Sequence, residues 1–442
     1  MLRPIRAGVF ATLALLSMVP PRGAVAEGER VVTLDEASAR ALATHDRIRA
    51  AEAVQERAEV APWRAVSALA PSVRDQVSYA RRKEEIAFPG DIAAALPGFN
   101  PVVIAQDEVR NVLAIGQPLY VHEFWALREI GKAEVQQSDE VYRAARADVL
   151  LSVAAAYYDL LRAQALAEVA QQTHALTEVE IAHAEERVRA GEAVQSDVLR
   201  VQTERARSDQ RLAETAGQVE IAGDVLRRLA QLSGPFTVTE PALRPIDLTS
   251  VDGYLQSARA QNPDLKIREA GVAEAVGEEH RREAKLYPSL GLDFNYQNIN
   301  HDTFADRNDF WTLMVRAQVP IFESGGSHLL DISEQRAVVS QREAESSGFA
   351  RDLEVDVRRA WVTARTLQAK HVAADEELHL ASDSYRMLSD QYTAGVATNL
   401  DVLTSLTALA SARADNASIR FAEALSRVQL ERVAGTLGGD GS

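Results

Sequence analysis

The stretch AGEAVQSDVL at residues 190–199 returns in altered form as AGVATNLDVL at residues 394–403. The similarity extends without a gap from Arg187–Gly234 onto Gln391–Gly438, at an offset of 204 residues. Repetition over this length indicates that one structural unit occurs twice. We therefore divide the chain into a signal peptide at 1–26, a first repeat at 27–234, a linker at 235–250, a second repeat at 251–438 and a tail at 439–442.

Each repeat has the same order of expected elements: a short helix, two strands, a proline, a very long helix and a shorter one. The copies of the Pro-Ser pair lie in LAPSV (69–73) and LYPSL (286–290), and the later proline lies in GQPLY (116–120) and QVPIF (318–322). The short helices are expected at about 34–66 and 251–284, and the strands at about 73–81, 109–117, 290–298 and 309–319. The predicted fold class is mainly α with a small β part.

The strands are predicted from residues that alternate along the chain between apolar and polar. In the second repeat Leu290, Leu292 and Phe294 alternate with Gly291, Asp293 and Asn295. This period of two is typical of a strand with one apolar face. Each strand has about nine or ten residues, the length that crosses a bilayer when tilted. A surface hairpin on a periplasmic domain would show the same pattern, but four strands in duplicated positions favour the membrane.

Four strands are too few to close a membrane barrel, since known barrels begin at about eight strands. Open strand edges are not tolerated in lipid, because their backbone groups lack hydrogen-bond partners there. If these strands span a membrane, several copies of the chain must therefore share them. The pattern predicts an oligomer.

The N-terminal residues have the pattern of an export signal. Arg3 and Arg6 precede an apolar run at 7–19, and Ala24-Val25-Ala26 is a small-residue cleavage site before Glu27. This pattern predicts a secretory signal peptide. The mature chain has no later run of about eighteen apolar residues, so we expect no transmembrane helix in it. A net charge of −16 argues against nucleic acid as a partner. The absence of cysteine excludes disulfides and thiolate metal sites.

Two proline-free stretches, at about 121–190 and 327–394, have apolar residues at helical spacing. A helix of seventy residues is about 100 Å long. Such a rod must pack lengthwise as a coiled coil or a helical barrel. A periplasmic coiled-coil scaffold or adaptor is the alternative from another functional class, but it gives the strands no role.

The turns after the long helices predict helical hairpins with tips at about 190–197 and 394–401. Gly191 and Gly395 lie where a helix C-terminus requires a left-handed residue. Ser196 and Asn399 follow as expected N-caps of the returning helices. Asp197 and Asp401 lie near the first turn of those helices, where a negative charge is stabilising.

These features together resemble the TolC-like family of outer-membrane efflux and secretion channels. The motifs that carry the resemblance are the two tips (Arg187 to Leu199, and Tyr392-Thr393-Ala394-Gly395 to Leu403), QPLY and VPIF before the long helices, and the Pro-Ser strand entries. The resemblance covers essentially the whole mature chain. It implies a homotrimer that forms a twelve-stranded barrel in the outer membrane of a Gram-negative bacterium, continued through the periplasm by an α-helical barrel.

The resemblance also implies a function and partners. Such channels are passive exit ducts of tripartite pumps or type I secretion systems, and they dock onto a periplasmic adaptor (membrane fusion protein) coupled to an inner-membrane pump. Drugs, metal ions, solvents and polypeptides all remain open as cargo. We expect no enzyme activity, no metal site and no cofactor, since Walker, dinucleotide-binding and G-x-S-x-G motifs are missing.

Residue by residue, the resemblance places a periplasmic gate or constriction at Ser196, Asp197, Tyr392 and Asp401. It places the adaptor-docking tips at Ala190, Gly191, Ala394 and Gly395.

Two positions depart from the family's gate pattern. Ala397 lies where an arginine is often found, and Thr404 where a second carboxylate is found. Another contact must therefore hold the gate closed, and Arg187 and Arg189 are the candidates.

Three further features carry no assigned site. HVAADEELH (371–379) has histidines and carboxylates near ligand spacing, but so charged a helix produces such sets by chance. Asp302, Asp306 and Asp309 lack the glycine and glutamate of a calcium loop. The loop at about 82–108 is expected outside the membrane, over the channel mouth.

Overall fold

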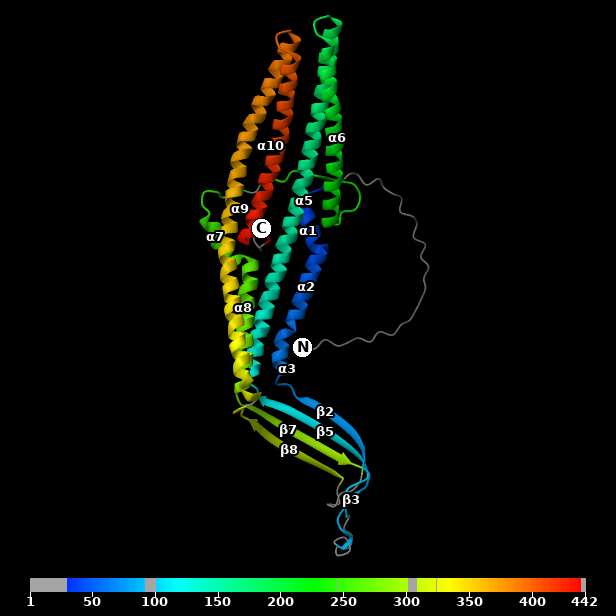
Figure 1. Cartoon of the computed structure of the whole chain (residues 1–442), viewed down its shortest axis with the longest axis vertical. Coiled ribbons are helices and arrows are strands. Elements are labelled where there is room, and N and C mark those ends of the chain that lie inside the picture. The colour runs from blue at the N-terminus through cyan, green and yellow to red at the C-terminus, as the bar shows by residue number, and fades with distance from the viewer. Residues whose placement is uncertain (1–29, 92–100, 244, 301–307, 323, 439–442) are drawn as a thin grey trace, which may run out of the picture.

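The computed structural model describes residues 30–91, 101–243, 245–300, 308–322 and 324–438. The expected signal peptide at 1–26 and tail at 439–442 lie outside the described residues, as do Asp302 and Asp306. The described chain is a long rod of helices. A β-sheet lies at one end, and the turns of two helical hairpins lie at the other (Figure 1).

The helices and the two long strands of the first half of the chain come in the order expected for the first repeat, and four short strands that were not expected lie among or after them. In chain order the elements are β1 (Arg30–Val32), α1 (Leu34–Thr44), α2 (Asp46–Glu59), α3 (Ala61–Ser67), β2 (Ser72–Arg81), β3 (Ile86–Ala87), β4 (Val102–Ile104), β5 (Asp107–Tyr120), α5 (Glu123–Arg189), α6 (Gln195–Leu229) and β6 (Phe236–Val238). The pair β3 and β4 forms a small antiparallel extension of the 82–108 loop, beyond the main sheet (Figure 1).

The second half of the chain repeats this order. Its elements are α7 (Asp252–Gln261), α8 (Pro263–Glu283), η1 (Ala284–Leu286), β7 (Ser289–Ile299), β8 (Asp309–Gln318), η2 (Ser324–Gly326), α9 (Ser327–Thr393) and α10 (Asn399–Ala434). The mainly α fold with a small β part and a duplicated unit is therefore confirmed. Both long helices, α5 and α9, have 67 residues, which corresponds to about 100 Å.

The four long strands form one antiparallel sheet in the order β2-β5-β7-β8. The two repeats meet at its centre, where Leu113 of β5 is opposite Tyr296 of β7. The outer strands β2 and β8 each have a partner on one side only among the described residues, and both are almost entirely exposed. The single chain thus leaves two open strand edges.

A buried core ties the middle of the rod together. Tyr157 of α5 is completely buried there among apolar residues of α1, α2, α6 and α10. Its hydroxyl lies 2.9 Å from the Val32 carbonyl oxygen and 2.7 Å from the Thr239 carbonyl oxygen. Tyr157 thereby holds the parallel pair β1–β6 against the long helix.

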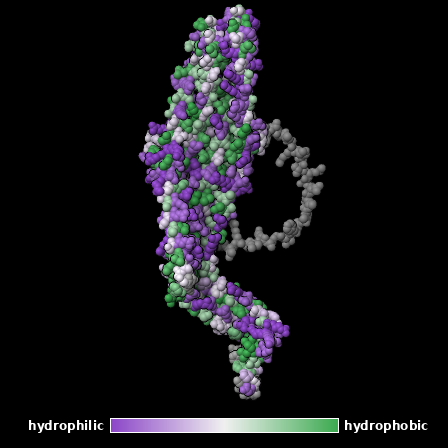
Figure 2. Space-filling view, viewed as in Figure 1, coloured by the Kyte–Doolittle hydropathy of each residue, from purple (hydrophilic) through white to green (hydrophobic). Residues whose placement is uncertain are grey.

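The surface of the rod is mixed. Polar and apolar residues are interspersed along it, and apolar residues gather where the rod meets the sheet (Figure 2). Among the described residues, no helix carries an apolar stretch long enough to span a membrane.

The expected short helices are each divided. The stretch 34–66 breaks at His45, whose backbone is extended, and again at Val60, just ahead of Pro62. The stretch 251–284 breaks at Asn262, because the residue before a proline disfavours the helical region. Asn262 then caps α8 by accepting a hydrogen bond from the Leu265 amide at 3.1 Å.

Two further expectations differ from the structure. Pro118 was expected after the strand but lies inside β5, which continues to Tyr120. The pairing register shifts between Pro118 and Tyr120, and such an irregularity accommodates a residue without an amide hydrogen. The 235–250 linker, for which no strand was expected, contributes β6 to the pair with β1.

Candidate functional site

The two hairpin tips turn through the same backbone motif. Gly191 and Gly395 have φ angles of +78° and +77°, as the sequence predicts. One residue later, the amides of Glu192 and Val396 donate to carbonyl oxygens in the last turn of α5 and α9, at 2.9 and 2.8 Å. A β-carbon at either glycine would meet nothing within 4 Å. The glycines are therefore required by backbone conformation and not by crowding.

The returning helices begin differently from the prediction. The N-cap of α10 is Thr398, one residue before Asn399, and its hydroxyl accepts a hydrogen bond from the Asp401 amide. The Asp401 carboxylate in turn accepts from the Thr398 amide at 2.9 Å and hydroxyl at 2.6 Å. This reciprocal pair is a capping box, whose Thr-x-x-Asp signal is visible in the sequence. Asn399 is wrong as a cap because it comes one residue too late.

The first tip has no such cap. The N-cap of α6 is Val194, which offers no side-chain acceptor, and Ser196 is already the second helical residue. The prediction of Ser196 as N-cap is therefore wrong. Asp197 occupies the position of Asp401 but lies 3.4 Å from Arg200 of the following turn instead. The two tips are alike in backbone and different in side-chain bonding.

Hydrogen bonding keeps Asp401 ionised. The Thr398 hydroxyl, and after it the Thr398 backbone amide, holds the pKa of the Asp401 carboxyl below its ordinary value. Asp401 is exposed, so its charge faces water at the tip. A carboxylate in this place can attract cations.

Arg187 joins the first hairpin to the second. Its Nη1 donates to the Tyr392 carbonyl oxygen at 2.9 Å, and its guanidinium lies 4.7 Å from the centre of the Tyr392 ring. Tyr392 is 2% exposed. The last turn of α9 has no basic residue of its own, so Arg187 supplies the positive charge that a helix C-terminus favours.

No hydrogen bond or ion pair among the described residues joins the four predicted gate residues to one another. Tyr392 meets Arg187 of the other hairpin, whereas Asp197 and Asp401 each bond within their own hairpin. Of the two candidate arginines, Arg189 bonds only to Glu185 of its own helix, at 3.4 Å. Of these two arginines, Arg187 is therefore the one that bridges the hairpins.

The four residues predicted to form the docking tips are all exposed at the end of the rod. Beside them lie exposed apolar side chains that the sequence analysis did not single out: Val194 (63% exposed), Val396 (77%) and Leu400 (57%). Their signal in the sequence is an apolar residue in an otherwise polar turn. Exposed apolar groups at a rod end are suited to contact with another protein.

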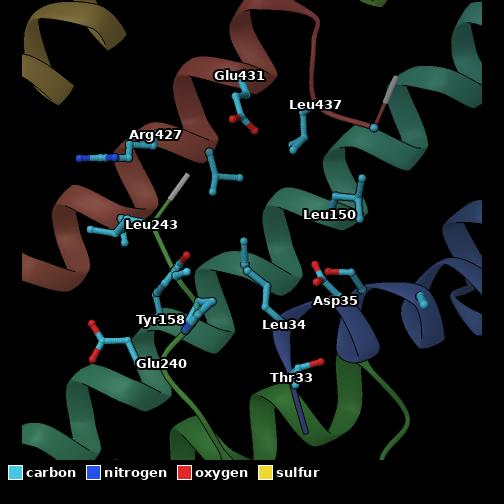
Figure 3. A pocket seen from close by; sticks show the side chains of 18 of the residues that line it. Thr33, Leu34, Asp35, Leu150, Tyr158, Glu240, Leu243, Arg427, Glu431 and Leu437 are labelled. Carbon is cyan, nitrogen blue, oxygen red and sulfur yellow. The ribbon is translucent and has the colours of Figure 1, made fainter. Parts of the chain in front are cut away.

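A hollow lies far from the tips. It has a volume of about 920 Å³ and is bounded by α1, α5, the linker and α10 (Figure 3). Carboxylates of Asp35, Glu240 and Glu431 and the guanidinium of Arg427 lie around it, together with apolar residues such as Leu34 and Leu150. It contains none of the predicted site residues.

The histidine-rich stretch of α9 bonds to its neighbour helix. His371 Nδ1 lies 2.7 Å from Glu423 Oε2 of α10 and its Nε2 lies 3.8 Å from Asp375. Within the described ranges, no three His, Cys, Asp or Glu side chains are placed to hold a metal ion.

Comparison with known proteins gives consistent results. The model of the family described as "Outer membrane efflux protein" matches residues 37–234 and 254–436, one range within each of the repeats that the sequence predicts. Protein CyaE of Bordetella pertussis is 28% identical over 70% of this chain and 68% of its own. The alkaline protease secretion protein AprF of Pseudomonas aeruginosa is 24% identical over 75% of this chain and 70% of its own. The outer membrane protein TolC of Vibrio cholerae is 25% identical over 73% of this chain and 75% of its own.

Solved structures share the fold. A crystal structure of CusC superimposes with a TM-score of 0.77 at 16% identity, covering 91% of this chain and 92% of the other. The outer-membrane channel OprN gives a TM-score of 0.76 at 17% identity, covering 91% and 90%.

Proposed function

Because the chain belongs to the outer membrane efflux protein family, we propose that its paired helical tips form the inward mouth of the channel and the docking site for its partners. The family is one of channels and not of enzymes. The protein is an efflux channel of the outer membrane with a helical portion in the periplasm, the exit duct of a tripartite pump or type I secretion system. The match of the family model to both repeats is the observation that carries this conclusion.

The proposed assembly is a homotrimer. The four-stranded sheet has unpaired outer strands on both sides, and three such sheets joined edge to edge supply twelve strands. The closed cylinder would leave no open edge in lipid. The long helices of three copies, continuing from the strands, would form the wall of the periplasmic duct.

The proposed partners are a periplasmic adaptor and, through it, an inner-membrane pump. Ala190, Gly191, Ala394 and Gly395 are exposed at the rod end, and the apolar Val396 lies beside them. The proposed constriction consists of Ser196, Asp197, Tyr392 and Asp401. Relatives are named for protease secretion and for cation efflux alike. We therefore propose no single cargo, and propose that the partner pump selects it.

The test is expression of the full chain in a Gram-negative host, followed by fractionation. We expect a heat-modifiable trimer in detergent extracts of the outer membrane, and discrete conductance steps when this material is added to planar bilayers. The matched sample is the same preparation from cells with the empty vector. A monomer recovered in osmotic-shock fluid would instead support a periplasmic scaffold and contradict the channel.

A further inference from the structure

The four long strands carry a set of arginines on one face of the sheet, at the end of the rod opposite the tips (Figure 1). Strand pairing places Arg74 of β2 in one row with Ala114 and Asn295, Arg110 of β5 opposite Ile299, and Arg316 of β8 opposite Gly291. Paired residues share a face of a sheet, as do residues an even number of positions apart on one strand. The three rows follow one another every fourth residue of β7, about 13 Å apart. We call Arg74, Arg110 and Arg316 the arginine ladder.

The opposite face of the sheet is apolar. It carries Val77, Leu113, Phe294 and Trp311, one from each of the four strands, and the rings of the last two stack with centroids 6.3 Å apart. Strands of a membrane barrel turn apolar residues toward lipid and polar residues toward the lumen. In the proposed trimer the arginine ladder therefore lines the duct inside the outer membrane.

Two members of the ladder bond to carboxylates that are less exposed than they are. Arg316 Nη2 lies 3.1 Å from Asp293 Oδ2, and Arg110 Nη2 lies 2.8 Å from Glu108 Oε1. The arginine side chains are 58% and 42% exposed, whereas the carboxylate side chains are 27% and 6% exposed. Glu108 is further shared with Arg82, directly after β2, at 3.5 Å. Anions in the lumen would therefore meet the guanidinium groups before the carboxylates.

The remaining member, Arg74, has no carboxylate partner. It is exposed and forms no ion pair with another described residue. The ladder and Arg82 together give four arginines against two carboxylates, which leaves two positive charges per chain and six in a trimer. The sign of this surface is opposite to the net charge of −16 of the whole chain. It is also opposite to the charge of the exposed Asp401 at the other end of the rod.

Positive groups around an aqueous path raise the local concentration of anions and lower that of cations. Arginine and lysine rings have this role in anion pores. We propose that the arginine ladder determines specificity in the outer-membrane segment of the duct: it favours the passage of anions and of cargo that carries acidic groups. This inference rests on the proposed function, in which three sheets close a barrel.

The first test measures ion selectivity of the full-length trimer in planar bilayers. Arg74→Gln removes the unpaired charge, and the control Arg81→Gln removes an arginine from the same strand but the opposite face. We expect Arg74→Gln to lower the ratio of chloride to potassium permeability about twofold in dilute KCl, the factor that one unit charge about 10 Å from the ion gives in water. The difference should vanish in about 1 M KCl, where the Debye length is about 3 Å. The control should keep the wild-type ratio.

A second test needs no conduction. The chain has no cysteine, so Ala114→Cys, directly opposite Arg74, and Ile115→Cys, its neighbour on the other face, each supply a single thiol. The probes are the sulfonatoethyl and trimethylammonioethyl methanethiosulfonates, which carry opposite charges. In trimers held in lipid vesicles, both probes should reach Ala114→Cys and neither should reach Ile115→Cys. At Ala114→Cys, adding Arg74→Gln should lower the ratio of anionic to cationic reaction rates about fourfold, twofold for each sign of charge.

The outcomes separate the ladder from the channel function. Unchanged permeability and rate ratios in Arg74→Gln would overturn the role of the ladder. Reaction at Ile115→Cys in place of Ala114→Cys would overturn it too, because the polar face would then not line the duct. A wild-type chain that forms no pore would contradict the proposed function, while the reaction rates would still test the ladder.

Discussion

At the scale of single residues, the two tips show that equivalent positions need not have equivalent roles. Asp197 and Asp401 are aligned by the duplication, yet only Asp401 is bonded by a capping threonine. The difference comes from one residue, Val194 against Thr398, because only a side-chain oxygen can accept the amide hydrogen of the first turn. Asp401 thus combines the proposed charge at the constriction with a part in the capping box, whereas at the first tip Asp197 has the proposed charge and no side chain caps the helix.

The charge of Asp401 and its part in the helix cap can be separated by a matched pair of substitutions. Asp401→Ala removes the carboxylate and with it the reciprocal half of the capping box, whereas Thr398→Ala removes the capping hydroxyl and keeps the charge. If Asp401 lines the constriction, only Asp401→Ala should reduce the preference for cations, measured as the reversal potential in a salt gradient across a planar bilayer. Equal selectivity of the two variants would remove Asp401 from the conducting path.

At the scale of elements, the helical rod depends on a few fixed points between segments distant in sequence. Tyr157 is one of them, because its hydroxyl bonds the carbonyls of Val32 and Thr239, 125 and 82 residues away. Gly435 is another: with φ at +76° it ends α10, and a β-carbon there would lie 2.7 Å from the Asn262 backbone. Such close approaches place the linker and α8 against the long helices.

Tyr157→Phe should therefore destabilise the middle of the rod. The hydroxyl shares its one proton between the two carbonyl oxygens and accepts a hydrogen bond from the Thr239 amide, so its removal takes these contacts away together. We expect a cost of about 1–3 kcal/mol, measured by chemical unfolding of the trimer. Burial is the main cause that raises the pKa of the Tyr157 phenol. The contribution should thus be complete below the ordinary tyrosine pKa of about 10, and it should be lost as pH rises through the higher value of the folded state. A wild-type advantage that grows above pH 10 would contradict this assignment.

At the scale of the whole molecule, the sheet has a partner missing on each side. The outward edges of β2 and β8 have no neighbouring strand among the described residues, and side chains of these strands such as Val77 and Leu313 are exposed. In lipid such edges must be paired. The trimer proposed above supplies that pairing between β2 of one copy and β8 of the next.

Cysteine pairs test this arrangement directly in a chain that has none. A series that pairs one position on β2 with one on β8 should give disulfide-linked dimers and trimers on gels, because the two strands meet only between copies. The control is Leu113→Cys with Tyr296→Cys, which face each other on β5 and β7 and should link within one chain. If every β2–β8 pair leaves the chain monomeric while the control links, the edge-to-edge trimer is wrong.

The sequence by itself determined the duplication, the order of elements, the strand period and the glycine turns. These are local or repeating signals: a period of two, a long stretch without proline, and a glycine where a left-handed residue is required. The same signals could have placed the cap at Thr398, since Thr-x-x-Asp is a local motif.

Only the tertiary structure decided which residues of the two hairpins meet. Glu180 and Tyr385 lie 205 residues apart, as do Arg187 and Tyr392, and the duplication aligns neither pair, since its offset is 204. Their contact depends on how α5 and α9 are rotated about their axes, and the packing of many side chains at once determines that rotation. A pattern along one chain predicts which face of a helix is buried, but it does not determine which residue of a distant helix lies opposite.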